Sequence, residues 1–142
     1  MRRMRRRGSL ITFGESTPRH QLRARADTLG SSEFILVALA NVRPELRIGV
    51  GVEISGPKEY YAALEKDMLR IEREIDYERG EGQGFEWNPG TKVRDVWLYR
   101  RADFFERRQW PEQQEWLCEK LEAFHKVLKP RIARLLHPLL ES

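Results

Sequence analysis

Two side chains of this sequence are of the types that form a nucleophile and its general base. Cys118 is the only cysteine among 142 residues, and His125 is one of three histidines. Both lie in WLCEKLEAFHKVLKPRIARLL, whose apolar spacing predicts a helix. Residues seven apart on one helix are separated by about 10.5 Å along its axis, whereas a nucleophile and its base must approach within about 3.2 Å. We therefore expect a packed thiol beside a half-exposed imidazole, and not a catalytic pair.

Sequence motifs that bind metals or phosphates are missing. His20, His125 and His137 are scattered, and no CxxC, HxxxH or HExxH spacing occurs. No GxxxxGKS/T or GxGxxG follows a predicted strand, and the glycines of GVGVE alternate with valines. Such glycines are expected to permit the close approach of another element. The sequence therefore predicts neither a metal nor a cofactor.

A small metal-dependent nuclease is an alternative. Nucleases of the restriction type place an acid, and then Glu-x-Lys, on adjacent strands, so that the carboxylates hold Mg²⁺ or Mn²⁺. The nearest pattern here is Glu45-Leu46-Arg47, with Asp27 upstream and Glu53 as a third acid. Arginine lacks the tunable pKa of lysine, and a polar residue at a hairpin entrance needs no catalytic reason. We therefore favour a non-catalytic protein over the nuclease.

Arginines crowd the N-terminal end of the chain. Residues 1–26 hold eight arginines and one acid, which gives +7, whereas residues 27–142 hold eighteen basic and twenty-one acidic side chains, which gives −3. Each arginine could displace counterions from a phosphate, so binding would depend on salt and not on base sequence. The candidate nucleic-acid-binding residues are Arg2, Arg3, Arg5, Arg6, Arg7, Arg19, Arg23 and Arg25. A solvated tail, or a start codon placed within a longer reading frame, explains these charges equally well.

The bulk composition is that of a single globular domain. Hydrophobic residues make up 40% of the chain and charged residues 34%. No run of about 18 apolar residues could span a membrane, and a lone cysteine without an intrachain disulfide fits the cytoplasm. We expect residues 1–8 to form a disordered basic arm and residues 9–142 to form one domain.

Two hairpins and two long helices are predicted to position these side chains. From residue 46 to 54 the chain alternates strictly, with one face apolar, after an apolar strand over 34–42. The second hairpin covers 85–101 and turns at 88–91; which of its faces is the inner one stays open. Steps of three and four predict helices over 57–77 and 111–136, the second passing through Pro130 without losing phase. A strand over 9–13 and a short helix over 18–26 are weaker predictions. We therefore expect an α+β fold in which two helices cover one face of an antiparallel sheet.

A family resemblance covers about two thirds of the chain. It rests mostly on packing residues: Glu45, Leu46, Ile71, Glu72, Trp87, Trp116, Leu117, Phe124, Pro130 and Ile132. These resemble a bacterial and archaeal domain family of unknown function, which often ends longer proteins that carry predicted restriction-type nuclease or other defence-associated domains. The resemblance implies no established catalytic residues. No nuclease domain precedes the match, so we expect the accessory part without the cutting part.

The predicted function is that of a non-catalytic interaction module in nucleic-acid processing or prokaryotic defence. It would bind a partner protein or a second copy, and its arm would bind nucleic acid without specificity. The alternatives are the nuclease, using Asp27, Glu45 and Glu53 with Mg²⁺ or Mn²⁺, and a purely structural oligomerisation domain.

Overall fold

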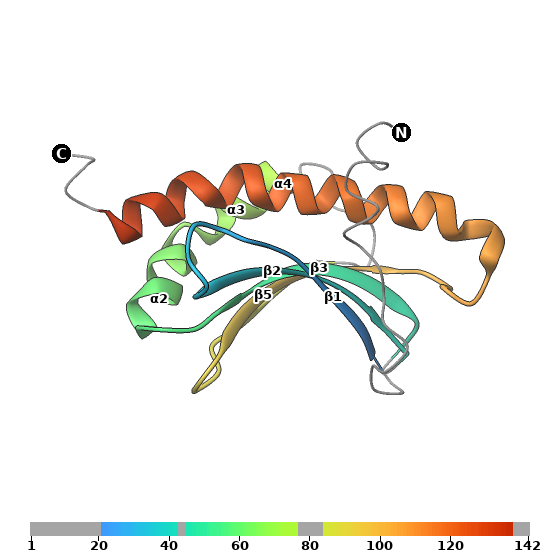
Figure 1. Ribbon diagram of the computed structural model, residues 1–142, viewed down its shortest axis with the longest axis horizontal. Helices are drawn as coiled ribbons and strands as arrows, with labels where there is room; N and C mark the ends of the chain where they lie inside the picture. The colour runs from blue at the N-terminus through green and yellow to red at the C-terminus, as the bar shows by residue number, and fades with distance from the viewer. Residues whose placement is uncertain (1–20, 43–44, 77–83, 138–142) are drawn as a thin grey trace.

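The computed structural model describes residues 21–42, 45–76 and 84–137. Five strands form one antiparallel sheet in the order β1-β2-β3-β5-β4. The strands are β1 (Gln21–Thr28), β2 (Phe34–Asn41), β3 (Arg47–Ile54), β4 (Phe85–Asn88) and β5 (Arg94–Arg101). The helices are α2 (Lys58–Lys66), α3 (Met68–Ile75) and α4 (Trp110–Leu136), the last preceded by the 3-10 turn Arg107–Gln109. All three helices lie on one side of the curved sheet (Figure 1), which confirms the α+β class.

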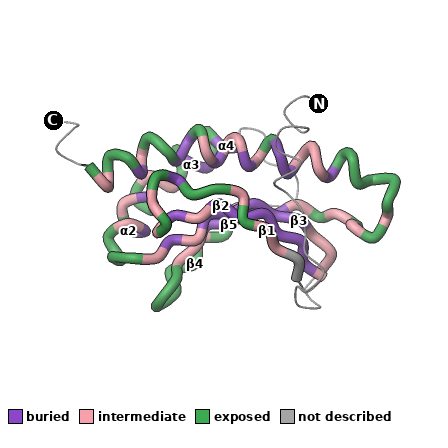
Figure 2. Tube along the Cα trace, in the orientation of Figure 1, coloured by how far each residue is buried: buried purple, intermediate pink, exposed green. Residues whose placement is uncertain are grey.

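The main core lies between the sheet and the helices. Alternate residues of β3 point toward the helices, as the strict alternation predicted, and Ile48, Val50, Val52 and Ile54 are all buried. Figure 2 shows the buried residues running along the central strands and the underside of α4. On β5 the inner face proves to be the one that carries Val96 and Leu98. The members contributed by the helices are Tyr61, Leu64, Ile71, Ile75, Leu117, Cys118, Leu121, Phe124, Val127, Leu128 and Ile132.

The helix predicted over 18–26 is wrong, because its described residues belong to edge strand β1. Arg23 pairs with Leu39 and Arg25 with Val37, with a register shift before Asp27. The segment LRARA alternates with a period of two, but alanine and arginine both favour helices, so propensity pointed the other way. Pairing with the apolar strand β2 overrides that propensity. The sheet therefore has one strand more than the two predicted hairpins supply, and the strand predicted over 9–13 lies outside the described residues.

The single helix predicted over 57–77 is also corrected, since it is broken at Asp67 into α2 and α3. Arg131 of α4 contacts this break: its Nε donates to Asp67 Oδ2 at 3.1 Å and its Nη1 to Glu74 Oε1 at 3.0 Å. Burial alone would lower the pKa of Arg131, but the hydrogen bonds with Glu74 and Asp67 raise that pKa above its ordinary value. Arg131 therefore joins α4 to the break at Asp67 and to α3.

Arg131→Met should lower the free energy of unfolding by about 1–2 kcal/mol, because hydrogen bonds between charged groups are lost at a largely buried side chain. Chemical denaturation measures the effect. The matched control is Arg70→Met, since Arg70 lies 4.0 Å from the same Asp67 carboxylate but is well exposed. That control should cost less than about 0.5 kcal/mol. Equal losses in the two variants would contradict the bridging role of Arg131.

Helix α4 continues through Pro130, as the unbroken apolar phase predicted. A proline inside a helix removes its own hydrogen bond to the carbonyl four residues earlier, which here is that of Lys126. Pro130 and Lys126 are both exposed, so water can hydrate the released carbonyl. Among the described residues, no helix combines the length and apolar character needed to cross a bilayer.

Candidate functional site

The three acids of the nuclease alternative lie apart. Asp27 sits opposite Leu36 on the helix-covered face of the sheet. Glu53 projects from the other face, where it forms an ion pair with Arg23. Glu45 lies just before β3 begins, at the end of that strand away from Glu53, and its carboxylate is 3.3 Å from Arg101. Within the described ranges, no three His, Cys, Asp or Glu side chains form a group that could hold a metal ion.

Cys118 and His125 are likewise separate in their surroundings. Cys118 is buried in the main core. His125 is half-buried, and its Nε2 lies 3.6 Å from Asp27 Oδ2 on β1. The imidazole thus faces a carboxylate of the edge strand and not the thiol. This is the arrangement of a packed thiol and a half-exposed imidazole that helix geometry predicted.

Two of the eight candidate arginines fall in the described part of the chain. Arg23 and Arg25 are alternate residues of β1, and both project from the face of the sheet that no described helix covers. Arg25 is exposed, whereas Arg23 is paired with Glu53. The other six, Arg2, Arg3, Arg5, Arg6, Arg7 and Arg19, lie outside the described residues. The basic run therefore ends on an ordered edge strand.

One face of the sheet, which we call the helix-free face because none of the described helices covers it, has a small core of its own. The stacked rings of Trp97 and Tyr99 lie 5.9 Å apart and are only 4% and 7% exposed. They cover Gly49 and Gly51 of β3, so the expected close approach at these glycines is confirmed. The guanidinium of Arg47 lies 3.5 Å from the Tyr99 ring centre. Because these rings are buried, they are not a surface on which a ligand could stack.

The charge state of Tyr99 reflects this burial. Desolvation raises the pKa of its hydroxyl to about 12, although the nearby Arg47 acts in the opposite direction. Arg47 in turn lies 3.5 Å from Glu86 of β4. Burial thus favours the neutral phenol, in keeping with the packed position of the ring.

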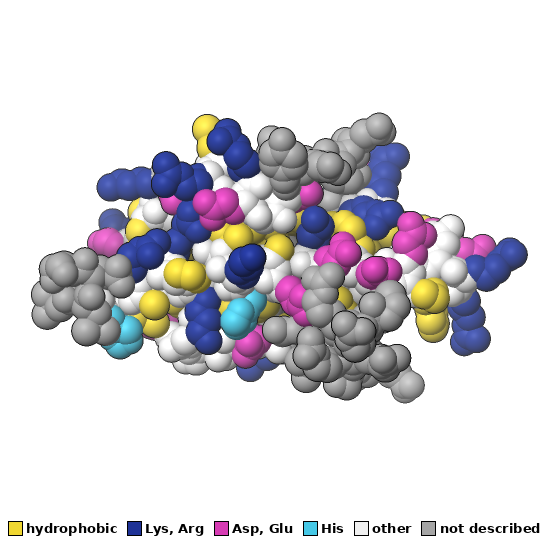
Figure 3. All heavy atoms as spheres, turned by 90° about the horizontal axis from the view of Figure 1, so that it is seen from above, with side chains coloured by type: hydrophobic (Ala, Val, Ile, Leu, Met, Phe, Trp, Pro, Cys, Tyr) yellow, Lys and Arg dark blue, Asp and Glu magenta, His cyan; other side chains and the backbone are white. Residues whose placement is uncertain are grey.

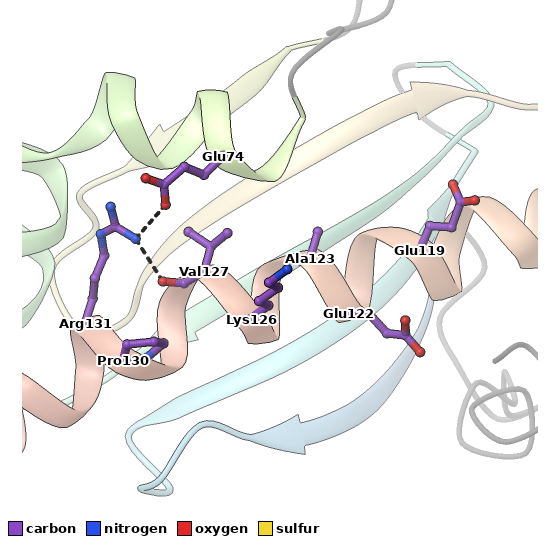
Figure 4. Close-up of a pocket in the computed structure, with 8 residues that line it drawn as sticks. All are labelled: Glu74, Glu119, Glu122, Ala123, Lys126, Val127, Pro130 and Arg131. Carbon is purple, nitrogen blue, oxygen red and sulfur yellow. Dashed lines mark hydrogen bonds and ion pairs between the residues drawn. The ribbon is translucent and has the colours of Figure 1, made fainter.

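A groove of about 700 Å³ runs between α3 and α4. Its lining is Glu74, Glu119, Glu122, Ala123, Lys126, Val127, Pro130 and Arg131. Figure 4 shows that all of these except Glu74 come from α4, and that Arg131 reaches across to Glu74. Figure 3 shows basic and acidic side chains interspersed over this side of the molecule. The lining mixes both signs of charge and offers no convergent pair for acid–base chemistry.

Glu72 and Trp87, two residues that carry the family resemblance, are joined in the fold. Trp87 Nε1 donates to Glu72 Oε2 at 2.8 Å, and the Glu72 side chain is buried against the core. The contact ties α3 to β4 across a segment that the structure does not describe. The sequence offered no signal for this pair, because its members are fifteen positions apart and lie on different elements.

The fold and these contacts define a two-layer α+β domain whose polar residues mostly join its elements. Residues 3–132 match the family described as a domain of unknown function, DUF4268, and the chain belongs to this family. The expected unknown-function domain is thus confirmed, over a longer stretch than residues 45–136. Neither a curated protein nor a solved structure matches this chain.

Proposed function

We propose that this chain is a non-catalytic, cytoplasmic interaction module of prokaryotic nucleic-acid processing or defence. Its N-terminal arginines hold nucleic acid without sequence preference, and its folded body docks on a partner protein. The observation that carries this proposal is the division of charge, +7 over residues 1–26 and −3 over residues 27–142. Phosphate binding needs concentrated positive charge, and here that charge is confined to one end of the chain.

The placement of β1 supports the proposal. The arginine-rich segment ends in Arg23 and Arg25, on an edge strand and on the face opposite the helices. Phosphates bound at Arg23 and Arg25 would lie on the opposite side of the sheet from the main core. The separate ion pairs of Glu45 and Glu53 support a module that does not itself cut nucleic acid.

The arm is tested by the salt dependence of binding. Replacing Arg2, Arg3, Arg5, Arg6 and Arg7 with glutamine should weaken binding to DNA duplexes of two unrelated sequences by the same factor. The slope of log K against log salt should become shallower by up to about 4.5, because each of the five lost phosphate contacts contributes about 0.9. Fluorescence anisotropy across a salt series measures both quantities.

The control replaces exposed arginines of the body, Arg70, Arg73 and Arg134, with glutamine and should leave the slope nearly unchanged. Equal slopes for the arm variant and the unaltered chain would refute a role for the arm. Incubation of plasmid with the protein and Mg²⁺ or Mn²⁺ should leave the DNA intact. Nicking that disappears in Glu45→Ala would instead favour the nuclease.

A further inference from the structure

The connection between β5 and α4 exposes aromatic side chains. Phe105 is 68% exposed and Trp110 is 44% exposed. The other exposed large hydrophobic residues in the described part of the chain stand singly, Leu69 on α3 and Val93 in the turn before β5. We call the segment 104–110 the aromatic tip. In Figure 1 it lies at the far end of the molecule, where α4 extends past the edge of the sheet. Isolated exposed apolar residues are ordinary, but neighbouring aromatic ones on a projecting element indicate a contact surface.

Hydrogen bonds hold the tip in one shape. Trp110 Nε1 donates to the carbonyl oxygen of Phe104 at 2.7 Å, and the backbone N–H of Phe105 donates to Asp103 Oδ1 at 3.1 Å. The buried Gln113 side chain donates to the Asp103 carbonyl oxygen at 3.0 Å. The rings of Phe104 and Phe105 lie 4.9 Å apart. The exposed rings are therefore presented by a fixed loop, which reduces the entropy lost when a ligand binds.

Arginines flank the exposed rings. The guanidinium of Arg107 lies 5.3 Å from the Trp110 ring centre, and the side chain of Arg108 is 91% exposed. Figure 3 shows basic, acidic and hydrophobic side chains together at this end of the molecule. Glu106 lies 3.9 Å from Arg108 and offsets part of this charge. Residues 100–112 still hold four arginines against three acids, in a body that is otherwise acidic.

We propose that the aromatic tip binds single-stranded nucleic acid, with one or two bases stacked on Phe105 and Trp110 and the adjoining phosphates at Arg107 and Arg108. Aromatic rings beside cations are the combination that binds single strands without regard to sequence. Arginine suits this role because its planar group both stacks and binds phosphate. A duplex keeps its bases paired and stacked, so it cannot use the rings. The inference rests on the proposed function and extends it, since the arm alone would not distinguish single strands from duplexes.

A docked protein fits the tip less well. A stable protein interface buries about 800 Å² on each partner around a close-packed centre. The tip instead presents two exposed rings on a projecting end, with charged side chains between them. Such a surface suits a narrow, flexible ligand that can wrap around it.

The test compares a 20-nucleotide oligo(dT) with a duplex of equal length, using Phe105→Ser and the control Leu69→Ser, which removes an equally exposed lone side chain. Unchanged circular dichroism confirms that both variants fold. Phe105→Ser should weaken oligo(dT) binding about tenfold and leave duplex binding within twofold. Leu69→Ser should change neither. Trp110→Phe keeps a ring but loses the hydrogen bond to the Phe104 carbonyl oxygen, so it should weaken oligo(dT) binding less than Phe105→Ser does. It should also lose the fluorescence quenching that oligo(dT) produces in the unaltered chain.

The outcomes separate this inference from the proposed function. If Phe105→Ser binds oligo(dT) as the unaltered chain does while the arm variant loses affinity, the tip assignment is wrong and the function stands. If the unaltered chain binds neither oligo(dT) nor duplex, both fail. If Phe105→Ser abolishes a concentration-dependent increase in mass and leaves oligo(dT) binding unchanged, the tip belongs to a protein interface and the inference is overturned.

Discussion

Leu121→Ala is expected to lower the free energy of unfolding by about 2–5 kcal/mol. Leu121 lies in the middle of α4, is 0% exposed and belongs to the main core. Truncation removes its transfer free energy and leaves a cavity between the helix and the sheet, which two rigid layers cannot fill by collapsing. Chemical denaturation of both proteins gives the difference directly, provided that the two slopes against denaturant agree.

Leu69→Ala is the matched control, because Leu69 sits on α3 and is 72% exposed. Its cost should stay within about 0.5 kcal/mol. A loss below about 0.5 kcal/mol for Leu121→Ala would place this residue outside the core. The packing of α4 against the sheet would then have to be redrawn.

Local periodicity predicted the elements that carry a strong apolar pattern. Strand β3 alternates without interruption from residue 47 to 54, and α4 keeps its apolar stripe from Leu117 to Leu135. The proline within α4 did not lead to a false helix end, because the apolar residues before and after it follow the same helical phase. In each of these elements the apolar positions of the pattern are buried, from Ile48 to Ile54 in β3 and from Leu117 to Ile132 in α4, so the sequence pattern alone predicted the structure.

Contacts between distant residues determined what the pattern could not show. The break at Asp67 has no glycine or proline to mark it, and the side chain that contacts it, Arg131, lies 64 residues away. Strand β1 was mistaken for a helix because its pairing partner, β2, settles its conformation against its own propensity. Which face of β5 is inner depended on whether Trp97 or Leu98 met the helices, and both are large and apolar.

The arrangement of the candidate site residues was partly predictable from the sequence. Spacing along one helix was sufficient to predict that Cys118 and His125 do not form a catalytic pair. By contrast, strand periodicity could not show that Asp27 and Glu53 lie on opposite faces of the sheet. The face on which Asp27 lies depends on the register shift in β1, which the sequence does not reveal. The aromatic tip had a usable signal in DFFERRQW, where aromatic and arginine residues cluster outside any periodic segment. Whether these aromatic residues form a surface depends on their exposure. That exposure depends on how far α4 extends past the sheet, which the sequence does not show.

Gly51→Ala should destabilise the protein by about 2–3 kcal/mol, although it adds a single methyl group. A Cβ at Gly51 would lie 2.5 Å from the backbone oxygen of Val96 and would overlap the Trp97 ring. The ring can tilt away only by disturbing its stack with Tyr99, and the carbonyl oxygen can move only by shifting strand β5. The added methyl group therefore cannot be accommodated without disturbing other contacts. Thermal and chemical denaturation should agree on the loss.

Gly84→Ala separates this steric effect from the general effect of replacing glycine. Among the described residues, no heavy atom beyond the chain neighbours of Gly84 lies within 4 Å of a Cβ placed there. The substitution therefore mainly restricts the unfolded chain and should be neutral or stabilising by up to about 1 kcal/mol. Gly51→Ala restricts the unfolded chain in the same way. Its steric cost must therefore exceed this stabilisation for the protein to be destabilised. If both variants are equally stable, Trp97 does not lie flat on β3. The packing described for the small core on the helix-free face would then be incorrect. A loss confined to Gly51→Ala supports a sheet in which the rings of Trp97 and Tyr99 pack flat against β3 on the face that no described helix covers.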